Sequence, residues 1–143
     1  MGIVSETNKV KPHTLRLRRI QGTFAICKLP PRNPIPPWAM SGDMWSVTRT
    51  ESELSVLCDQ ASLPREVQAE RNWRALQVAG PLPFDMVGVL SSLLTPIADA
   101  GVSIFAFSTF DTDFVLVREE AFENACQALR RAGHTIVAGE AQP

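Results

Sequence analysis

The segment that decides the fold is "DMVGVLSSLLTPIADAGVSIFAFSTF", residues 85–110. Between positions 86 and 97 its apolar residues recur three or four apart, which predicts an amphipathic helix. Asp85 can serve as the N-cap of this helix, and Gly101 suits the left-handed position just beyond its end. The alternation that follows, over 102–110, predicts a strand.

The flanking segments extend this pattern in both directions. "NWRALQVAG" (72–80) predicts a strand before the helix, and "FVLVRE" (114–119) predicts a hairpin partner after the turn "DTD" (111–113). A second helix is predicted over 120–133 and a last strand in "HTIV" (134–137). This β-α-β-β-α-β order predicts an α+β fold, a ferredoxin-like sandwich of four antiparallel strands with both helices on one face.

The predicted sheet has a second face that also needs a cover. Both alternating sets of side chains over 102–107 are largely apolar, and 114–117 repeats this pattern. We therefore expect the face away from the helices to be covered by the N-terminal half, by another subunit, or by both.

The N-terminal half is rich in predicted strands and shows no long amphipathic helix. Four segments alternate in polarity: "TLRLRRI", "TFAICKL", "WSVTRT" and "ELSVLCD". We expect a β-rich unit over 13–70 packed with a C-terminal unit over 71–138. Residues 1–12 and 139–143 are expected to be flexible tails.

Composition excludes several classes of function. The chain has 143 residues, a net charge of −1 and a pI near 6.1, so no global field favours nucleic acid. The basic run "RLRR" at 16–19 alternates with leucine and is interpreted as the solvent face of a strand. No signal peptide is recognisable, and the most apolar region, 86–98, is too short and too polar to span a bilayer. We expect a cytoplasmic protein without a membrane partner.

The cysteines and histidines form no recognisable catalytic or metal-binding motif. Cys27, Cys58 and Cys126 are far apart and show no zinc-ligand spacing, so buried, reduced thiols are expected. His13 and His134 give no nucleophile–base pattern. We therefore expect no enzyme activity, no metal and no cofactor.

Two blocks resemble a known family. "GVLSSLLTPIADAGVSIFAFST" resembles the signature of ACT domains, with Gly88-Val89-Leu90 at the strand–helix turn and Gly101 before the next strand. "FSTFDTDFVLVRE" is similar to the ACT subgroup that includes the CASTOR arginine sensors and small bacterial proteins. The resemblance extends over about residues 15–137. It implies a pair of ACT-like units that bind a small ligand, usually an amino acid, for regulation and not for catalysis.

The resemblance also implies where the ligand lies. In related proteins the ligand occupies an ACT–ACT interface, between the strand–helix loop and the adjoining hairpin, so a homodimer or other homo-oligomer is expected. A helix N-terminus suits an α-carboxylate, Asp113 would pair with a cationic group, and Phe110 would pack on an alkyl stem. The matching positions are Asp85, Met86, Val87, Gly88, Val89, Thr109, Phe110 and Asp113.

Each of these residues also has a purely structural interpretation. Asp85 is equally explained as a helix cap, Asp113 as a turn former, and Phe110 as a core or interface residue. Gly88 can serve close packing of the helix on the sheet, and Asp111 is expected to be an exposed turn residue. A protein–protein interaction module that binds no small ligand is the main alternative function. An acylphosphatase-like enzyme is disfavoured, because Ile26 and Cys27 follow "IQGTFA" where a phosphate-binding arginine would be needed.

Overall fold

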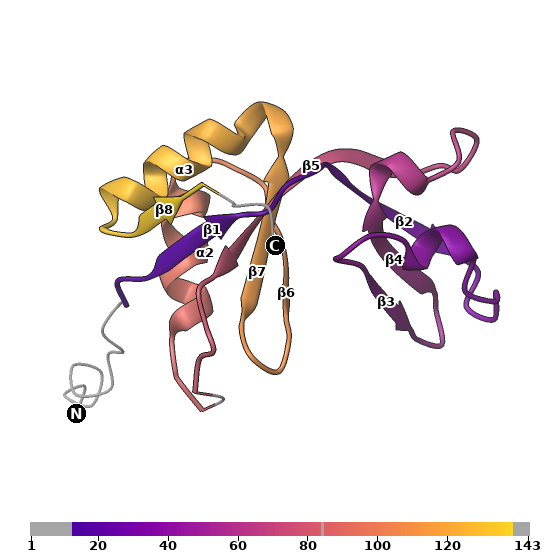
Figure 1. Ribbon diagram of the computed structural model, residues 1–143, viewed down its shortest axis with the longest axis horizontal. Helices are drawn as coiled ribbons and strands as arrows, with labels where there is room; N and C mark the ends of the chain where they lie inside the picture. Colours follow the sequence, from indigo (N-terminus) through magenta and orange to yellow (C-terminus); the bar gives the residue numbers. More distant parts are fainter. Residues whose placement is uncertain (1–12, 84, 139–143) are drawn as a thin grey trace, which may run out of the picture.

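The computed structural model describes residues 13–83 and 85–138, which form a single mixed sheet with helices on one side (Figure 1). The predicted flexible tails, 1–12 and 139–143, lie outside the described residues. The strands are β1 (Arg16–Arg19), β2 (Phe24–Leu29), β3 (Ser46–Arg49), β4 (Leu54–Asp59), β5 (Glu70–Val78), β6 (Phe105–Ser108), β7 (Asp113–Arg118) and β8 (Thr135–Val137). The helices are α2 (Val89–Asp99) and α3 (Phe122–Arg131), with 3-10 turns at Pro37–Met40, Gln60–Ser62 and Glu119–Ala121.

The C-terminal half has the predicted order β5-α2-β6-β7-α3-β8, and the α+β, ferredoxin-like class is confirmed. β7 lies between β5 and β6 and pairs antiparallel with both. The expected sheet of four antiparallel strands is wrong at one edge, because β1 lies between β5 and β8. Leu17 of β1 is opposite Val78 in an antiparallel pair and opposite Ile136 in a parallel pair. Leu17 of the inserted strand is 1% exposed and packs in the core beneath the helices.

The N-terminal half contributes an antiparallel sheet in the order β3-β4-β2. β5 joins the two halves, because its first residues pair with β2 and its last residues pair with β1. Between β1 and β2 the chain bends at Gly22, whose φ of +97° favours glycine. All eight strands therefore belong to one sheet. The unit boundaries at 13–70 and 71–138 stay a prediction.

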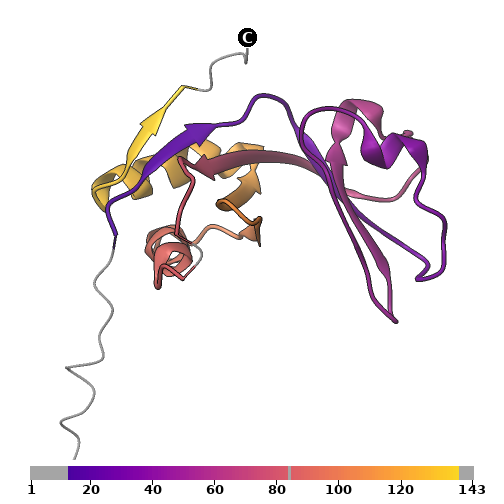
Figure 2. The ribbon, with the colours of Figure 1, turned by 60° about the horizontal axis from the view of Figure 1, so that its bottom comes forward.

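The main core lies between the helices and one face of the sheet. Figure 2 shows α2 and α3 on the same side of the strands. Leu93 and Ile97 of α2 and Leu129 of α3 pack there with Leu17 and Val115, all at most 3% exposed. Each such side chain contributes roughly 1.5–3 kcal/mol by leaving water. The three-to-four-residue spacing of the helical residues explains why these segments fold as helices on this sheet.

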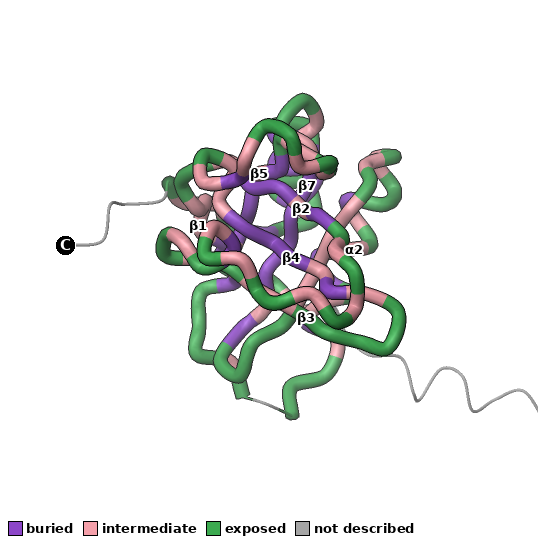
Figure 3. The backbone as a smooth tube through the Cα atoms, turned by 90° about the vertical axis from the view of Figure 1, so that its right-hand side faces the viewer, coloured by how far each residue is buried: buried purple, intermediate pink, exposed green. Residues whose placement is uncertain are grey.

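The second face of the sheet is covered in part by the N-terminal half. Trp73 and Leu116 pack in one cluster with Phe24 and Leu57. Figure 3 shows buried stretches along β2, β4 and β5, and β5 is the strand that joins the two halves. The expected cover from the N-terminal half is therefore confirmed for this region.

Among the residues that the structure describes, none of the helices combines the length and apolar character needed to cross a bilayer.

Candidate functional site

The two segments predicted to hold a ligand face each other across a hollow of about 180 Å³. It lies between the described residues of the loop that leads into α2, 82–83 and 85–89, and the turn 108–113, which joins β6 to β7. Of the eight predicted site residues, five line it: Met86, Val89, Thr109, Phe110 and Asp113. Asp85, Val87 and Gly88 lie in the same loop but outside the lining.

The hairpin turn is fixed to the end of β5. Thr112 is 6% exposed, and its Oγ1 donates a hydrogen bond to the carbonyl of Val78 at 2.6 Å. The N–H of Leu82 donates to the carbonyl of Asp111 at 2.8 Å, which ties the loop to the turn. Within the turn, the N–H of Thr109 donates to the carbonyl of Thr112 at 2.8 Å. One wall of the hollow is thus held by several hydrogen bonds.

Asp113 supplies a carboxylate to this wall. It is half-buried and lies opposite Ser108 in the β6–β7 pair, and Ser108 Oγ donates to Asp113 Oδ1 at 2.5 Å. The bond orients the carboxylate and leaves further acceptor positions on its oxygens. Phe110, at the tip of the turn, is 81% exposed, and Asp111 is exposed as predicted.

On the opposite side of the hollow, α2 begins after Gly88. The structure makes Gly88 the N-cap residue of α2, with φ +85°, so the prediction that Asp85 caps this helix is wrong. Asp85 is exposed three residues before the cap. The Gly88 carbonyl accepts hydrogen bonds from Ser91 Oγ at 3.1 Å and Ser92 Oγ at 2.8 Å. The first N–H groups of α2 have no acceptor within the helix, which makes this end suited to an anion.

Two histidines hold this loop against β1. His13 donates its backbone N–H to Ser92 Oγ at 2.9 Å, and its Nε2 lies 2.7 Å from the carbonyl of Val87. His134 is 5% exposed, with its Nε2 2.9 Å from the carbonyl of Ser92. The loop and the first turn of α2 are therefore positioned by residues from both ends of the described chain.

The thiols do not belong to the site. Cys27, Cys58 and Cys126 are all buried and free, as predicted. Burial raises the pKa of each, and that of Cys58 to about 11. These thiols therefore stay protonated and are weak nucleophiles at neutral pH.

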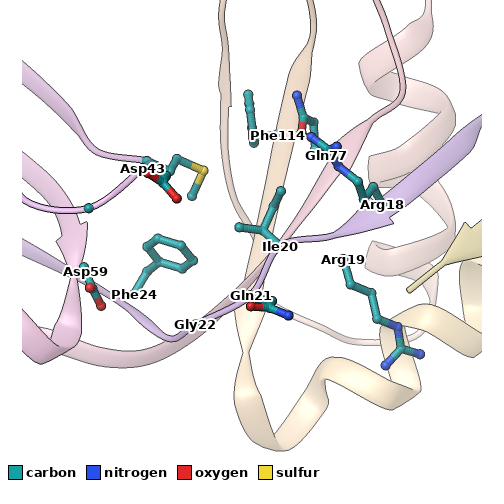
Figure 4. Close-up of a pocket in the computed structure, with 12 residues that line it drawn as sticks. Arg18, Arg19, Ile20, Gln21, Gly22, Phe24, Asp43, Asp59, Gln77 and Phe114 are labelled. Carbon is teal, nitrogen blue, oxygen red and sulfur yellow. Dashed lines mark hydrogen bonds between the residues drawn. The ribbon is translucent and has the colours of Figure 1, made fainter. Parts of the chain in front are cut away.

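A larger hollow of about 570 Å³ lies elsewhere, between the two halves of the chain. None of the predicted site residues lines it. Its walls come from the bend between β1 and β2, the loop before β3, and residues of β5 and β7 (Figure 4). Gly22, within "RRIQGTFAI", is the one sequence signal that could have located it, as a break between two alternating strands.

Comparison with protein families gives two adjacent matches. The model of the ACT domain matches residues 68–131, and a model of an N-terminal domain matches residues 22–66. Human putative protein CASTOR3P is 30% identical over 86 residues, which cover 51% of this chain and 53% of that protein. The human cytosolic arginine sensor for mTORC1 subunit 1 is 35% identical over 60 residues, 41% of this chain. The chain thus spans about half the length of the first relative and 18% of the second.

Solved structures agree with the fold along most of the chain. A crystal structure of an Agrobacterium tumefaciens protein superposes with a TM-score of 0.85 and 33% identity, covering 92% of this chain and 98% of that one. The regulatory subunit of aspartate kinase from Thermus flavus has a TM-score of 0.57 and 14% identity, covering 85% and 99%. The second likeness concerns the fold alone.

Proposed function

Since the chain belongs to the ACT-domain family, in its CASTOR-type subgroup, we propose that it is a regulatory protein that binds an amino acid without transforming it. The ligand is held between the 84–89 loop and the 108–113 hairpin. The proposal requires no catalytic group, metal or cofactor. The arginine named for the human sensor makes L-arginine the first ligand to test.

One observation carries the proposal: two segments about twenty residues apart in sequence line the same hollow and offer complementary charges. Asp113 presents a half-buried carboxylate from the hairpin wall. On the facing wall, Val89 is the first residue of α2, and the N–H groups at the start of a helix have no acceptor within it. An amino acid has an α-carboxylate for the helix end and a cationic group for Asp113.

The small volume of the hollow explains why a second unit belongs to the site. About 180 Å³ is below the roughly 300–1,000 Å³ typical of small-molecule pockets. Met86, Val87 and Phe110 expose 36%, 64% and 81% of their surface at its rim. A second copy packed on these residues would close the hollow and bury apolar surface. Binding and self-association are therefore expected to strengthen each other.

The test is a thermal-unfolding screen of the twenty amino acids. A ligand at about 100 times its Kd should add roughly 2.7 kcal/mol of stability, which is readily seen as a rise in Tm. The rise should disappear in Asp113→Asn and persist in Asp99→Asn, an exposed carboxylate at the far end of α2. Sedimentation with and without the ligand should show the dimer fraction increasing. A screen without any rise in Tm would reject amino-acid binding.

A protein–protein interaction module is the second candidate, and one observation favours it. Ile35, Met40 and Trp45 of the N-terminal half are large apolar residues with 40–45% of their surface exposed. Such residues are the kind that protein interfaces bury. Loss of partner binding on Trp45→Ala, together with a screen that finds no ligand, would favour this candidate over the sensor.

A further inference from the structure

The hollow between the two halves has two chemically different walls. One wall belongs to the C-terminal part of the sheet and carries Ile20, Gln77, Phe114 and Arg18. The other belongs to the N-terminal half and carries Phe24, Asp43, Met44 and Asp59. Figure 4 shows Phe24, Asp43 and Asp59 on one side and Ile20, Gln77, Phe114 and Arg18 on the other. Its volume of about 570 Å³ lies within the range of small-molecule pockets.

Arg18 supplies the positive charge of the first wall. Its NH2 group donates to Gln77 Oε1 at 2.5 Å, which orients the guanidinium, and its other N–H groups remain for a ligand. Neighbouring Arg19 also lines the hollow, but its guanidinium is bound to Glu123 of α3 at 2.9 Å (Figure 4). Among the described residues, Arg18 is thus the arginine of this wall that is not held in an ion pair.

Two carboxylates supply the negative charge of the opposite wall. Asp43 is exposed in the loop before β3. Asp59 is half-buried at the end of β4, where its Oδ1 accepts the N–H of Ala61 at 3.2 Å and its Oδ2 is left for another partner. Within residues 13–83 and 85–138 the ion pairs are Arg19–Glu123 and Arg118–Glu70, so neither aspartate is neutralised by them. Phe24 lines the same wall as the two aspartates and supplies an apolar group (Figure 4).

We propose that this hollow is a second ligand site, separate from the loop–hairpin site, for a molecule with one carboxylate and two cationic groups on a short apolar stem. The carboxylate binds Arg18, because a guanidinium suits planar anions. The two cationic groups bind Asp43 and Asp59, and the stem packs on Phe24 and Phe114. Such a ligand has one negative and two positive charges, which balance the one positive and two negative charges of the protein. A basic amino acid has this charge pattern.

Binding at this site links the two halves of the chain. Arg18 and Gln77 belong to β1 and β5, whereas Asp43 precedes β3, and the connection between β1 and β2 bends at Gly22. A ligand that contacts both walls stabilises one angle at this bend, because each other arrangement loses one set of contacts. The proposal does not depend on the loop–hairpin site.

The experiment is a titration of the ¹⁵N-labelled full chain with L-lysine, followed by amide NMR. Gly22 and Gly42 border the hollow, and Gly88 reports on the loop–hairpin site. We expect saturable shifts at Gly22 and Gly42. Cadaverine, which lacks the carboxylate, and L-norleucine, which lacks the side-chain ammonium, should each bind roughly ten- to hundredfold more weakly, because each loses a charged hydrogen bond.

Variants assign the two charges. Arg18→Gln should remove the preference for L-lysine over cadaverine, and Asp43→Asn should weaken L-lysine binding. The amide spectra of both variants should remain those of a folded protein. Asp113→Asn is the control that should leave the shifts at Gly22 and Gly42 intact. Shifts confined to Gly88 would overturn this proposal and leave the proposed function standing. The proposal would also be overturned if the native chain bound cadaverine as tightly as L-lysine, or if the shifts persisted in both variants. The absence of any shift at Gly22 and Gly42 at millimolar L-lysine would overturn it as well.

Discussion

The ring of His134 accepts a hydrogen bond at Nδ1 from the backbone N–H of Leu15, at 3.0 Å and across 119 positions of sequence. The same ring lies 2.9 Å from the carbonyl of Ser92 through Nε2. Because Nδ1 is an acceptor, the ring is neutral with its proton on Nε2, which donates to Ser92. One buried side chain therefore joins the start of β1, the first turn of α2 and the segment before β8.

Replacing His134 by alanine should lower the free energy of unfolding by roughly 1–3 kcal/mol. The substitution leaves a backbone N–H and a carbonyl without their buried partner. Urea unfolding of His134→Ala and His13→Ala gives the comparison, because the His13 ring contact with Val87 is solvent-exposed and should matter less. Equal effects in the two variants would contradict this account of His134.

Thr112 should be the main anchor of the hairpin wall. Thr112→Val keeps the side-chain shape but removes the donor to the Val78 carbonyl, so a loss of roughly 1–2 kcal/mol is expected. Thr95→Val, at an exposed position of α2, is the matched control and should change stability little. Amide exchange should also become faster in residues 108–113 of Thr112→Val. Unchanged exchange in that segment would mean that other contacts hold the hairpin.

The helices and the β6–β7 hairpin could be predicted because their signals are local. The apolar spacing of α2 and α3 and the "DTD" turn each lie within a few residues of what they determine. The place of β1 could not be predicted in this way. Its alternation specifies a strand, but its neighbours β5 and β8 lie about 60 and 120 residues away in sequence. Alternation alone does not specify which strands are the neighbours.

The two hollows differ in the same respect. Met86 and Asp113 could be placed near one another because the resemblance to ACT domains implies that the strand–helix loop lies next to the hairpin. The hollow between the halves depends on where the loop around Asp43 meets the bend at Gly22, and no local pattern specifies that meeting. The interpretation of residues 16–19 as a solvent face does not reveal that Arg18 is half-buried and lines a hollow with an opposite wall.

Gly88 should be required for the backbone that begins α2. Its φ of +85° is unfavourable for a residue with a Cβ, and Gly88→Ala should cost roughly 1–2 kcal/mol. Gly88→Asn should cost less, because asparagine tolerates the left-handed region better than alanine. Thermal unfolding of both variants measures the difference. An alanine variant as stable as the native chain would show that the start of α2 adjusts without this conformation.

Stability should fall as the pH rises from about 9 to about 11, because of the buried thiols. Burial raises the pKa of Cys58 to about 11 from an ordinary value of 9.0, so the folded protein keeps a proton that the unfolded chain releases. The contribution is complete below the pKa of the unfolded chain and is lost as the pH passes the folded value. Urea unfolding at about pH 8.5 and about pH 10.5 measures it.

Cys58→Ala provides the control for this pH dependence. The variant should be less stable throughout, because it leaves a small cavity, but its stability should vary less between the two pH values. The dependence should not vanish, because burial also raises the pKa of Cys27 and Cys126. If native protein and Cys58→Ala lose the same stability over this interval, the Cys58 thiol is not the group whose ionisation opposes folding.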